Sequence, residues 1–169
     1  VMIPRRGTYV ADISLKDVVQ VFEIRSALEE LAAGLAAERI TPDELEELER
    51  ILVEINEYID RDEFDKIVDT DIRFHGVLYR ASRNNRLVDI LHNLREQMLR
   101  FRSISMHYPG RLAATWEEHR QLVESIANHN SVQARKIAKK HMENSEKTLI
   151  MGIKRDKDSA RLVQELFPH

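Results

Sequence analysis

The sequence contains no cysteine, which excludes disulfide bonds and thiolate metal ligands together. Any metal site must therefore use nitrogen and oxygen donors. Only five glycines and four prolines interrupt the 169 residues, which favours long helices. No stretch approaches the roughly 18 consecutive apolar residues of a membrane helix, and no secretory signal is evident. We therefore expect a cytoplasmic protein with no membrane partner.

The chain also lacks a strong charge of either sign, with a formal net charge of −3. This balance gives no general reason to expect nucleic acid on its own surface. Hydrophobic residues make up 43% and charged residues 33%, which is typical of one soluble domain with a substantial core. Because the sequence begins with valine, we expect a fragment or a processed product.

Apolar residues recur at helical spacing through most of the chain. One start is marked by Thr41 followed by Pro42, a capping residue and a proline in the first turn. The pattern predicts helices over residues 14–38, 42–60, 62–81, 86–107, 111–128 and 131–152, with a short last helix over 158–166. Short connections between them predict an all-α antiparallel bundle of about six or seven helices.

Residues 1–11 differ from the rest of the chain. Tyr9 and Val10 follow a short basic turn and read as the end of a strand, but no strand partner is evident elsewhere in the sequence. We therefore expect the partner to lie N-terminal to Val1. The predicted division is a remnant at 1–11 and a single helical domain at 12–169.

Four polar residues fall on the apolar stripes of three predicted helices. Asp71 and His75 are one turn apart on the third helix, His119 lies on the fifth and His141 on the sixth. Burying a neutral polar group unpaired costs about 1–3 kcal/mol, so each needs a partner. A backbone carbonyl or a neighbouring side chain is the ordinary partner of a single core histidine. Three imidazoles and one carboxylate together instead predict a divalent transition metal, and imidazole nitrogens favour Zn, Ni, Cu, Fe or Co. We expect Zn first, with Ni or Mn as alternatives.

Two arginines are candidates for binding an anion beside this metal. Arg25 lies on the stripe of the first helix, and Arg102 follows Met98 by one turn on the fourth. A guanidinium can bind a carboxylate or phosphate bidentately. The alternative is a salt bridge within the bundle, for example between Arg25 and Glu29. The four remaining histidines are expected at the surface: His92, His107, His129 and His169.

These residues resemble the C-terminal effector domain, called FCD, of bacterial transcription regulators of the GntR family and FadR subgroup. The resemblance covers residues 14–152 and rests on five pieces of sequence: Phe22-Glu-Ile-Arg25 with Leu28-Glu29, Asp71-Ile-Arg-Phe74-His75, Ser82 to Leu87, Glu118-His119, and His141. It implies a helical bundle in which Asp71, His75, His119 and His141 bind one divalent ion at the floor of an effector cavity.

The resemblance also implies partners. The effectors of such domains are small organic acids, and the regulators act as homodimers. Residues 5–10 resemble the end of the wing of a winged-helix DNA-binding domain, through which operator DNA would be read. The expected function is therefore a metal-containing carboxylate-sensing and dimerisation domain that controls DNA binding by an N-terminal winged helix.

Two other uses of a metal are open to such a chain. A metal-dependent hydrolase would activate water at the open positions of the ion. No further carboxylate is obvious on the inward stripes as a general base, and Glu118 falls beside the inward face, so we expect no enzyme. A purely structural ion, closed to ligands, is the other alternative, and its removal would unfold the bundle.

Overall fold

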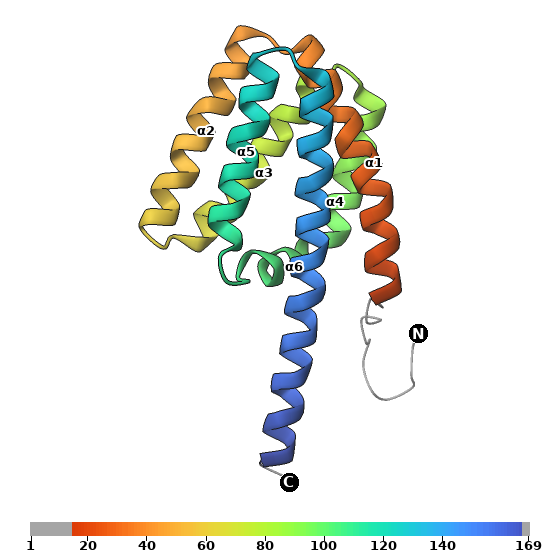
Figure 1. The fold of residues 1–169 in the computed structure, drawn as a ribbon, viewed down its shortest axis with the longest axis vertical. Coiled ribbons are helices and arrows are strands. Elements are labelled where there is room, and N and C mark those ends of the chain that lie inside the picture. Colours follow the sequence, from red (N-terminus) through yellow and green to blue (C-terminus); the bar gives the residue numbers. More distant parts are fainter. Residues whose placement is uncertain (1–14, 167–169) are drawn as a thin grey trace, which may run out of the picture.

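Six α-helices make up the described part of the chain, residues 15–166, in this computed structural model (Figure 1). Side chains are described for residues 16–98, 101 and 104–155. The helices are α1 Leu15–Arg39, α2 Pro42–Asp60, α3 Phe64–Ala81, α4 Asn85–Met106, α5 Arg111–Ala127 and α6 Ser131–Leu166. The predicted all-α bundle is confirmed. The wing remnant predicted at 1–11 lies outside the described residues.

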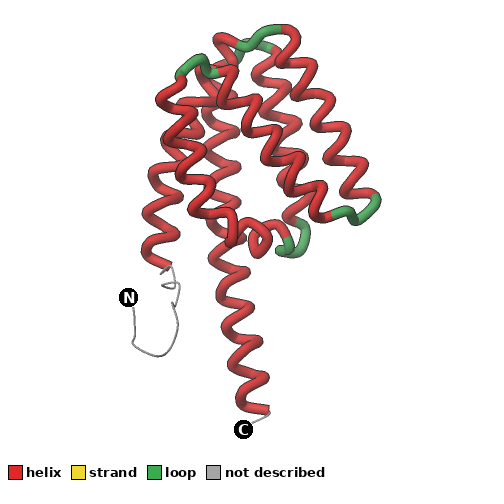
Figure 2. Tube along the Cα trace, turned by 180° about the vertical axis from the view of Figure 1, so that it is seen from behind, coloured by secondary structure: helices red, strands yellow, loops and turns green. Residues whose placement is uncertain are grey.

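Short turns at the ends of the bundle connect consecutive helices, as Figure 2 shows. The turn into α2 has the predicted cap: the Thr41 hydroxyl accepts a hydrogen bond from the Glu44 backbone, and the Glu44 carboxylate accepts one from the Thr41 backbone. Such a reciprocal pair satisfies two amides that the first turn of a helix leaves open. The cap therefore fixes where α2 begins.

The C-terminal part of the prediction was wrong, because α6 is one continuous helix from Ser131 to Leu166. A break after Gly152 and a separate helix from Asp158 do not occur. Gly152 instead permits close packing, since a Cβ at this position would lie 2.6 Å from Cγ2 of Ile104 on α4. A glycine inside a helix costs only about 1 kcal/mol relative to alanine, too little to end α6 there. Its last turns extend beyond the bundle (Figure 1).

The buried apolar residues form two separate clusters. The larger cluster fills the space among all six helices and includes Phe74 and Leu78 of α3. The smaller one joins α1, α4 and α6 through Val18, Phe22, Met98, Met142 and Leu149. Within residues 15–166, no helix has the length and apolar character needed to cross a membrane.

Candidate metal centre and its cavity

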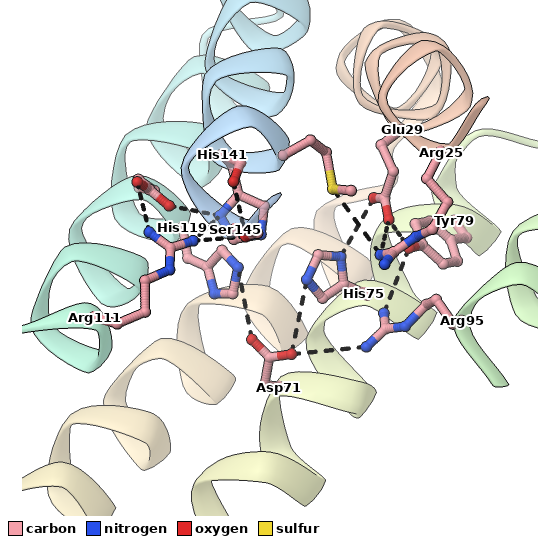
Figure 3. A network of polar contacts seen from close by, with 12 residues as sticks. Arg25, Glu29, Asp71, His75, Tyr79, Arg95, Arg111, His119, His141 and Ser145 are labelled. Atoms are coloured by element: carbon pink, nitrogen blue, oxygen red, sulfur yellow. Dashed lines mark hydrogen bonds and ion pairs between the residues drawn. The ribbon is translucent and has the colours of Figure 1, made fainter. Parts of the chain in front are cut away.

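Three histidines from three helices meet inside the bundle (Figure 3). His75 of α3, His119 of α5 and His141 of α6 are all buried, and one ring nitrogen of each lies within 4.8 Å of the others. The helical stripes predicted that these rings point inward, and the packing of α3, α5 and α6 brings them together.

Asp71 lies one turn before His75 and faces two of the rings. Its Oδ2 is 3.8 Å from Nε2 of His75, and its Oδ1 is 3.8 Å from Nε2 of His119. These distances are too long for hydrogen bonds. They suit ligands that share one ion, because each ligand atom then lies about 2.0–2.2 Å from the metal. The donor set of three nitrogens and a carboxylate thus fits a divalent transition metal.

The ring of His75 is in the form that a metal requires. Burial, reinforced by the positive charge of Arg95, lowers the pKa of His75 to about 3. The imidazole is therefore neutral at physiological pH, and a neutral ring has a lone pair to give to a metal.

Two carboxylates lie behind the histidines, on the side away from Asp71. Oε2 of Glu118 is 2.6 Å from Nδ1 of His141, and Oε2 of Glu29 is 3.5 Å from Nδ1 of His75. A carboxylate at one ring nitrogen fixes the orientation and the tautomer of a histidine that binds metal through the other. Both contacts leave Nε2 of the ring available for an ion.

Glu118 connects α5 to α6, a role that its position in the sequence does not indicate. It lies beside the inward face of α5, as predicted, yet it accepts hydrogen bonds from Arg111 at 3.0 Å and from Asn144 at 2.7 Å. Burial alone would raise its pKa, but the hydrogen bonds from His141 and Arg111 lower it to about 2. The ionised carboxylate therefore joins α5 to α6 behind the histidine cluster.

We predict that Glu118→Gln weakens metal binding about 10–100-fold, the usual cost of losing a carboxylate behind a metal-binding histidine. Isothermal titration of the metal-free protein with Zn²⁺ measures the change. The matched control is Glu117→Gln, since the neighbouring Glu117 pairs with Arg120 on the exposed face of the same helix. Equal affinities of the two variants would show that Glu118 does not orient His141.

Glu29 links the cluster to α1. Its carboxylate accepts hydrogen bonds from Arg25, at 2.9 Å, and from the hydroxyl of Tyr79. Burial alone would raise the pKa of Glu29, but His75 and the two guanidinium groups of Arg25 and Arg95 hold it well below its ordinary value. The salt bridge foreseen as an alternative role of Arg25 is therefore present.

Two further arginines at the site were missed in the sequence. Arg95 of α4 places Nη2 3.7 Å from Oδ2 of Asp71, and Arg111 of α5 donates to the hydroxyl of Ser145 at 2.7 Å. Their spacing could have indicated that they face inward. Arg95 follows Leu91 by four residues and Arg111 precedes His119 by eight, so each lies on the same helix face as a buried residue. The side chain of Arg102, the other predicted anion-binding residue, lies outside the described residues.

A cavity of about 80 Å³ opens beside this cluster. Asp71, His75 and His141 line it together with Arg25, Arg95 and Arg111. The rest of its wall combines apolar side chains with the hydroxyl-bearing residues Ser105, Thr115 and Ser145. The predicted surface positions of His92, His107 and His129 are confirmed, and His169 lies outside the described residues.

Most of the chain matches one known protein family. The FCD domain matches residues 20–144, most of the helical bundle. The chain belongs to the FCD domain family. This confirms the resemblance drawn from the sequence, and the match includes all four predicted metal ligands of this FCD domain.

Relatives of this FCD domain are transcription regulators. YdhC of Bacillus subtilis, an HTH-type regulator, is 29% identical over 134 residues, which are 78% of this chain and 59% of YdhC. LutR of Bacillus subtilis is 30% identical over 139 residues, 79% of this chain and 63% of LutR. The HTH-type repressor RspR of Escherichia coli is 25% identical over 140 residues, 83% of this chain and 61% of RspR. The chain thus spans about three fifths of their length. The family and these relatives are transcription regulators and not enzymes, as predicted for this domain.

Solved structures share the fold of this FCD domain. McbR/YncC of Escherichia coli superposes with a TM-score of 0.77 at 20% identity, over 89% of this chain and 76% of that one. The metal-free FCD domain of TM0439 gives a TM-score of 0.69 at 22% identity, over 86% of this chain and 99% of that one. The six-helix architecture is therefore the FCD fold.

Proposed function

We propose that this domain senses a small organic acid, with the acid bound between a divalent metal and arginine side chains. The observation that carries the proposal is that one cavity contains both the cluster of Asp71, His75 and His141 and the guanidinium groups of three arginines. The metal would be held by these three residues and His119. When bound, the ion would supply a Lewis-acidic site for a carboxylate oxygen.

The charges at the site support an anionic ligand. The three positive side chains are Arg25, Arg95 and Arg111, and the three carboxylates paired with them are Glu29, Asp71 and Glu118. Three positive and three negative charges cancel, and the histidines are taken as neutral ligands. A divalent ion therefore leaves an excess of two positive charges, which a buried site must balance. A carboxylate ligand would offset one of these two charges.

Arg25 is one of the three arginines that could hold the acid. It lines the cavity, and one of its terminal nitrogens is occupied by Glu29. Its Nε is buried, and no group among the described residues accepts a hydrogen bond from it. A buried donor without a partner costs about 1–3 kcal/mol.

The position of α1 supports a link from the cavity to DNA binding. Phe22 and Arg25 bring α1 to the cavity, and α1 packs along α6, which contributes His141. An acid that contacts both helices favours the arrangement that it binds more tightly. The relatives are HTH-type regulators. We therefore extend the proposal to a cytoplasmic homodimeric regulator whose helix-turn-helix domains, in winged-helix form and preceding residue 12, bind operator DNA.

The identity of the ion is part of the proposal, with Zn first and Ni or Mn as alternatives. Elemental analysis with native mass spectrometry on gently purified protein measures it directly. One equivalent of a single transition metal is the expected result. Metal content far below one equivalent, after loading with each of the three ions, would contradict a metal centre.

Replacing Arg25 tests the anion-binding part of the proposal. Arg25→Ala is expected to weaken acetate or propionate binding to the metal-loaded protein about 10–100-fold, since hydrogen bonds to charged groups are worth about 1.5–3 kcal/mol. Metal content should stay at the wild-type value. The control is Arg73→Ala, which removes an arginine paired with Glu54 at the surface of the bundle.

Isothermal titration of both variants tests the role of Arg25. Titration of acid into the metal-loaded wild-type protein, and chelation of its metal, separate the sensor from the enzyme and from the purely structural ion. Binding of the acid without turnover is the outcome expected of a sensor. Unfolding on chelation, without acid binding at any metal occupancy, would indicate a purely structural ion. Unchanged affinity of Arg25→Ala would leave Arg25 with its structural role as the partner of Glu29.

A further inference from the structure

Arg95 of α4 makes few hydrogen bonds for a buried guanidinium. Among the described residues it makes one, in which Nη1 donates to the Tyr79 hydroxyl at 3.4 Å. Its ion pair with Asp71, at 3.7 Å between Nη2 and Oδ2, is too long to be a second. In Arg111, by contrast, both terminal nitrogens donate hydrogen bonds, at 3.0 and 2.7 Å. Arg95 therefore lines the cavity with donors left for a ligand.

The carboxylate that pairs with Arg95 is also the proposed carboxylate ligand of the ion. The two oxygens of Asp71 face Nε2 of His75 and Nε2 of His119. A bound ion would lie about 2.0–2.2 Å from its ligand oxygen, against 3.7 Å for the guanidinium, so the ion would take most of the charge of Asp71. Because Arg95 is only 9% exposed, water would replace this partner only in part.

A second guanidinium lies beside Arg95, as Figure 3 shows. Arg25 of α1 donates to Oε1 of Glu29 at 2.9 Å. The Tyr79 hydroxyl donates to the same oxygen and accepts the hydrogen bond from Arg95. Two buried arginines from α1 and α4 thus share one carboxylate.

The excess positive charge of a metal-loaded site therefore divides into two parts. A divalent ion bound by Asp71 and neutral histidines keeps one positive charge. Arg25 and Arg95 share Glu29, which leaves a second positive charge on their side of the cavity. The third arginine of the cavity has its own carboxylate, Glu118. A monocarboxylate would offset only one of the two excess charges.

We propose that the effector is a dicarboxylate, whose second carboxylate pairs with Arg95. This rests on the proposed function, in which the first carboxylate binds between the ion and an arginine. The planar guanidinium of Arg95 can donate two parallel hydrogen bonds to a carboxylate, and such charge-assisted bonds are stronger than those to a neutral group. With both carboxylates bound, the charges of the site balance.

Pairs of acids that differ in charge but hardly in size test the second carboxylate. Malonate, succinate and glutarate are titrated into the Zn²⁺-loaded wild-type protein, each beside its monoamide. The hydroxyls of Ser105, Thr115 and Ser145 also line the cavity and can hydrogen-bond either form, so the comparison isolates the charge. Free Zn²⁺ is kept equal in cell and syringe, because dicarboxylates also bind it in solution. We expect at least one diacid to bind about 10–100-fold more tightly than its monoamide.

A pair of arginine variants assigns this preference to one residue. Arg95→Gln should bring the ratio of the two affinities, within the preferred pair of acids, down to about one. Arg86→Gln is the control and should keep the wild-type ratio, because Arg86 is exposed on the same helix and does not line the cavity. A wild-type ratio in Arg95→Gln would contradict the assignment to Arg95. The wild-type pairs decide the class of effector even where Arg95→Gln fails to fold.

The outcomes separate this inference from the function on which it rests. If every monoamide binds as tightly as its diacid, the dicarboxylate is wrong and a sensor of one carboxylate stands. If neither kind of acid binds to the Zn²⁺-loaded protein, the proposed function fails and the inference fails with it. Tighter binding of a diacid, lost in Arg95→Gln, supports both.

Discussion

Replacing His119 with alanine is expected to abolish stoichiometric metal binding. His119 is the most deeply buried member of the cluster, at 1% exposure, and its ring is stacked on Phe74 with centroids 4.1 Å apart. Packing therefore holds the ring in one place, with Nε2 facing Asp71. Losing a ligand removes a bond to the ion itself, so the loss should exceed the roughly 10–100-fold expected for Glu118→Gln.

Metal analysis after dialysis of the loaded protein measures this loss. The control is His92→Ala, which removes an exposed histidine of α4 and should leave one equivalent of metal in place. Circular dichroism should show the same helix content in both variants, because the bundle retains its two apolar clusters. Full metal content in His119→Ala would remove the metal centre from the proposed function.

Replacing Glu29 with alanine is expected to destabilise the fold by about 3–5 kcal/mol, the usual cost of removing one member of a buried ion pair. Glu29 is almost completely buried and accepts hydrogen bonds from Arg25 and Tyr79. Without Glu29, the guanidinium of Arg25 and the buried hydroxyl of Tyr79 both lose their hydrogen-bond acceptor. Urea denaturation followed by circular dichroism measures the free energy of unfolding.

The matched control is an ion pair of similar length at the surface. Glu54 pairs with Arg73 at 2.6 Å, but their side chains are 37% and 53% exposed. Glu54→Ala should cost no more than about 1 kcal/mol, because water replaces the lost partner. Similar losses in the two variants would indicate that Glu29 contributes no more than a surface carboxylate.

The helices and the inward-facing histidines could be predicted from the sequence because both follow from local periodicity. An imidazole that interrupts an apolar stripe faces the interior wherever the helix packs, so His75, His119 and His141 needed no tertiary information. The helix break predicted after Gly152 was wrong because it depended on tertiary packing. Whether a glycine ends a helix or admits a neighbour depends on what packs against it, and here the neighbour is Ile104 of α4.

The residues behind the histidines were harder to predict. Glu118 lies beside the inward face of α5, and its role comes from the position of His141 on α6, which only the packing of two helices determines. Arg95 could have been found, since it continues the stripe of Leu91 on α4. A charged residue on such a stripe shows that a partner exists but does not identify it as Asp71.

The histidine cluster has a consequence for the chain as a polymer. His75, His119 and His141 come from α3, α5 and α6, so a bound ion would cross-link segments that are far apart in the sequence. In a chain without cysteine, this would do the work of a disulfide bond. Closing a loop between residues 75 and 141 removes chain entropy from the unfolded state worth about 4 kcal/mol in the entropic description. If the ion is exchangeable, this cross-link between helices would be reversible. The stability of the bundle would then depend on the supply of metal.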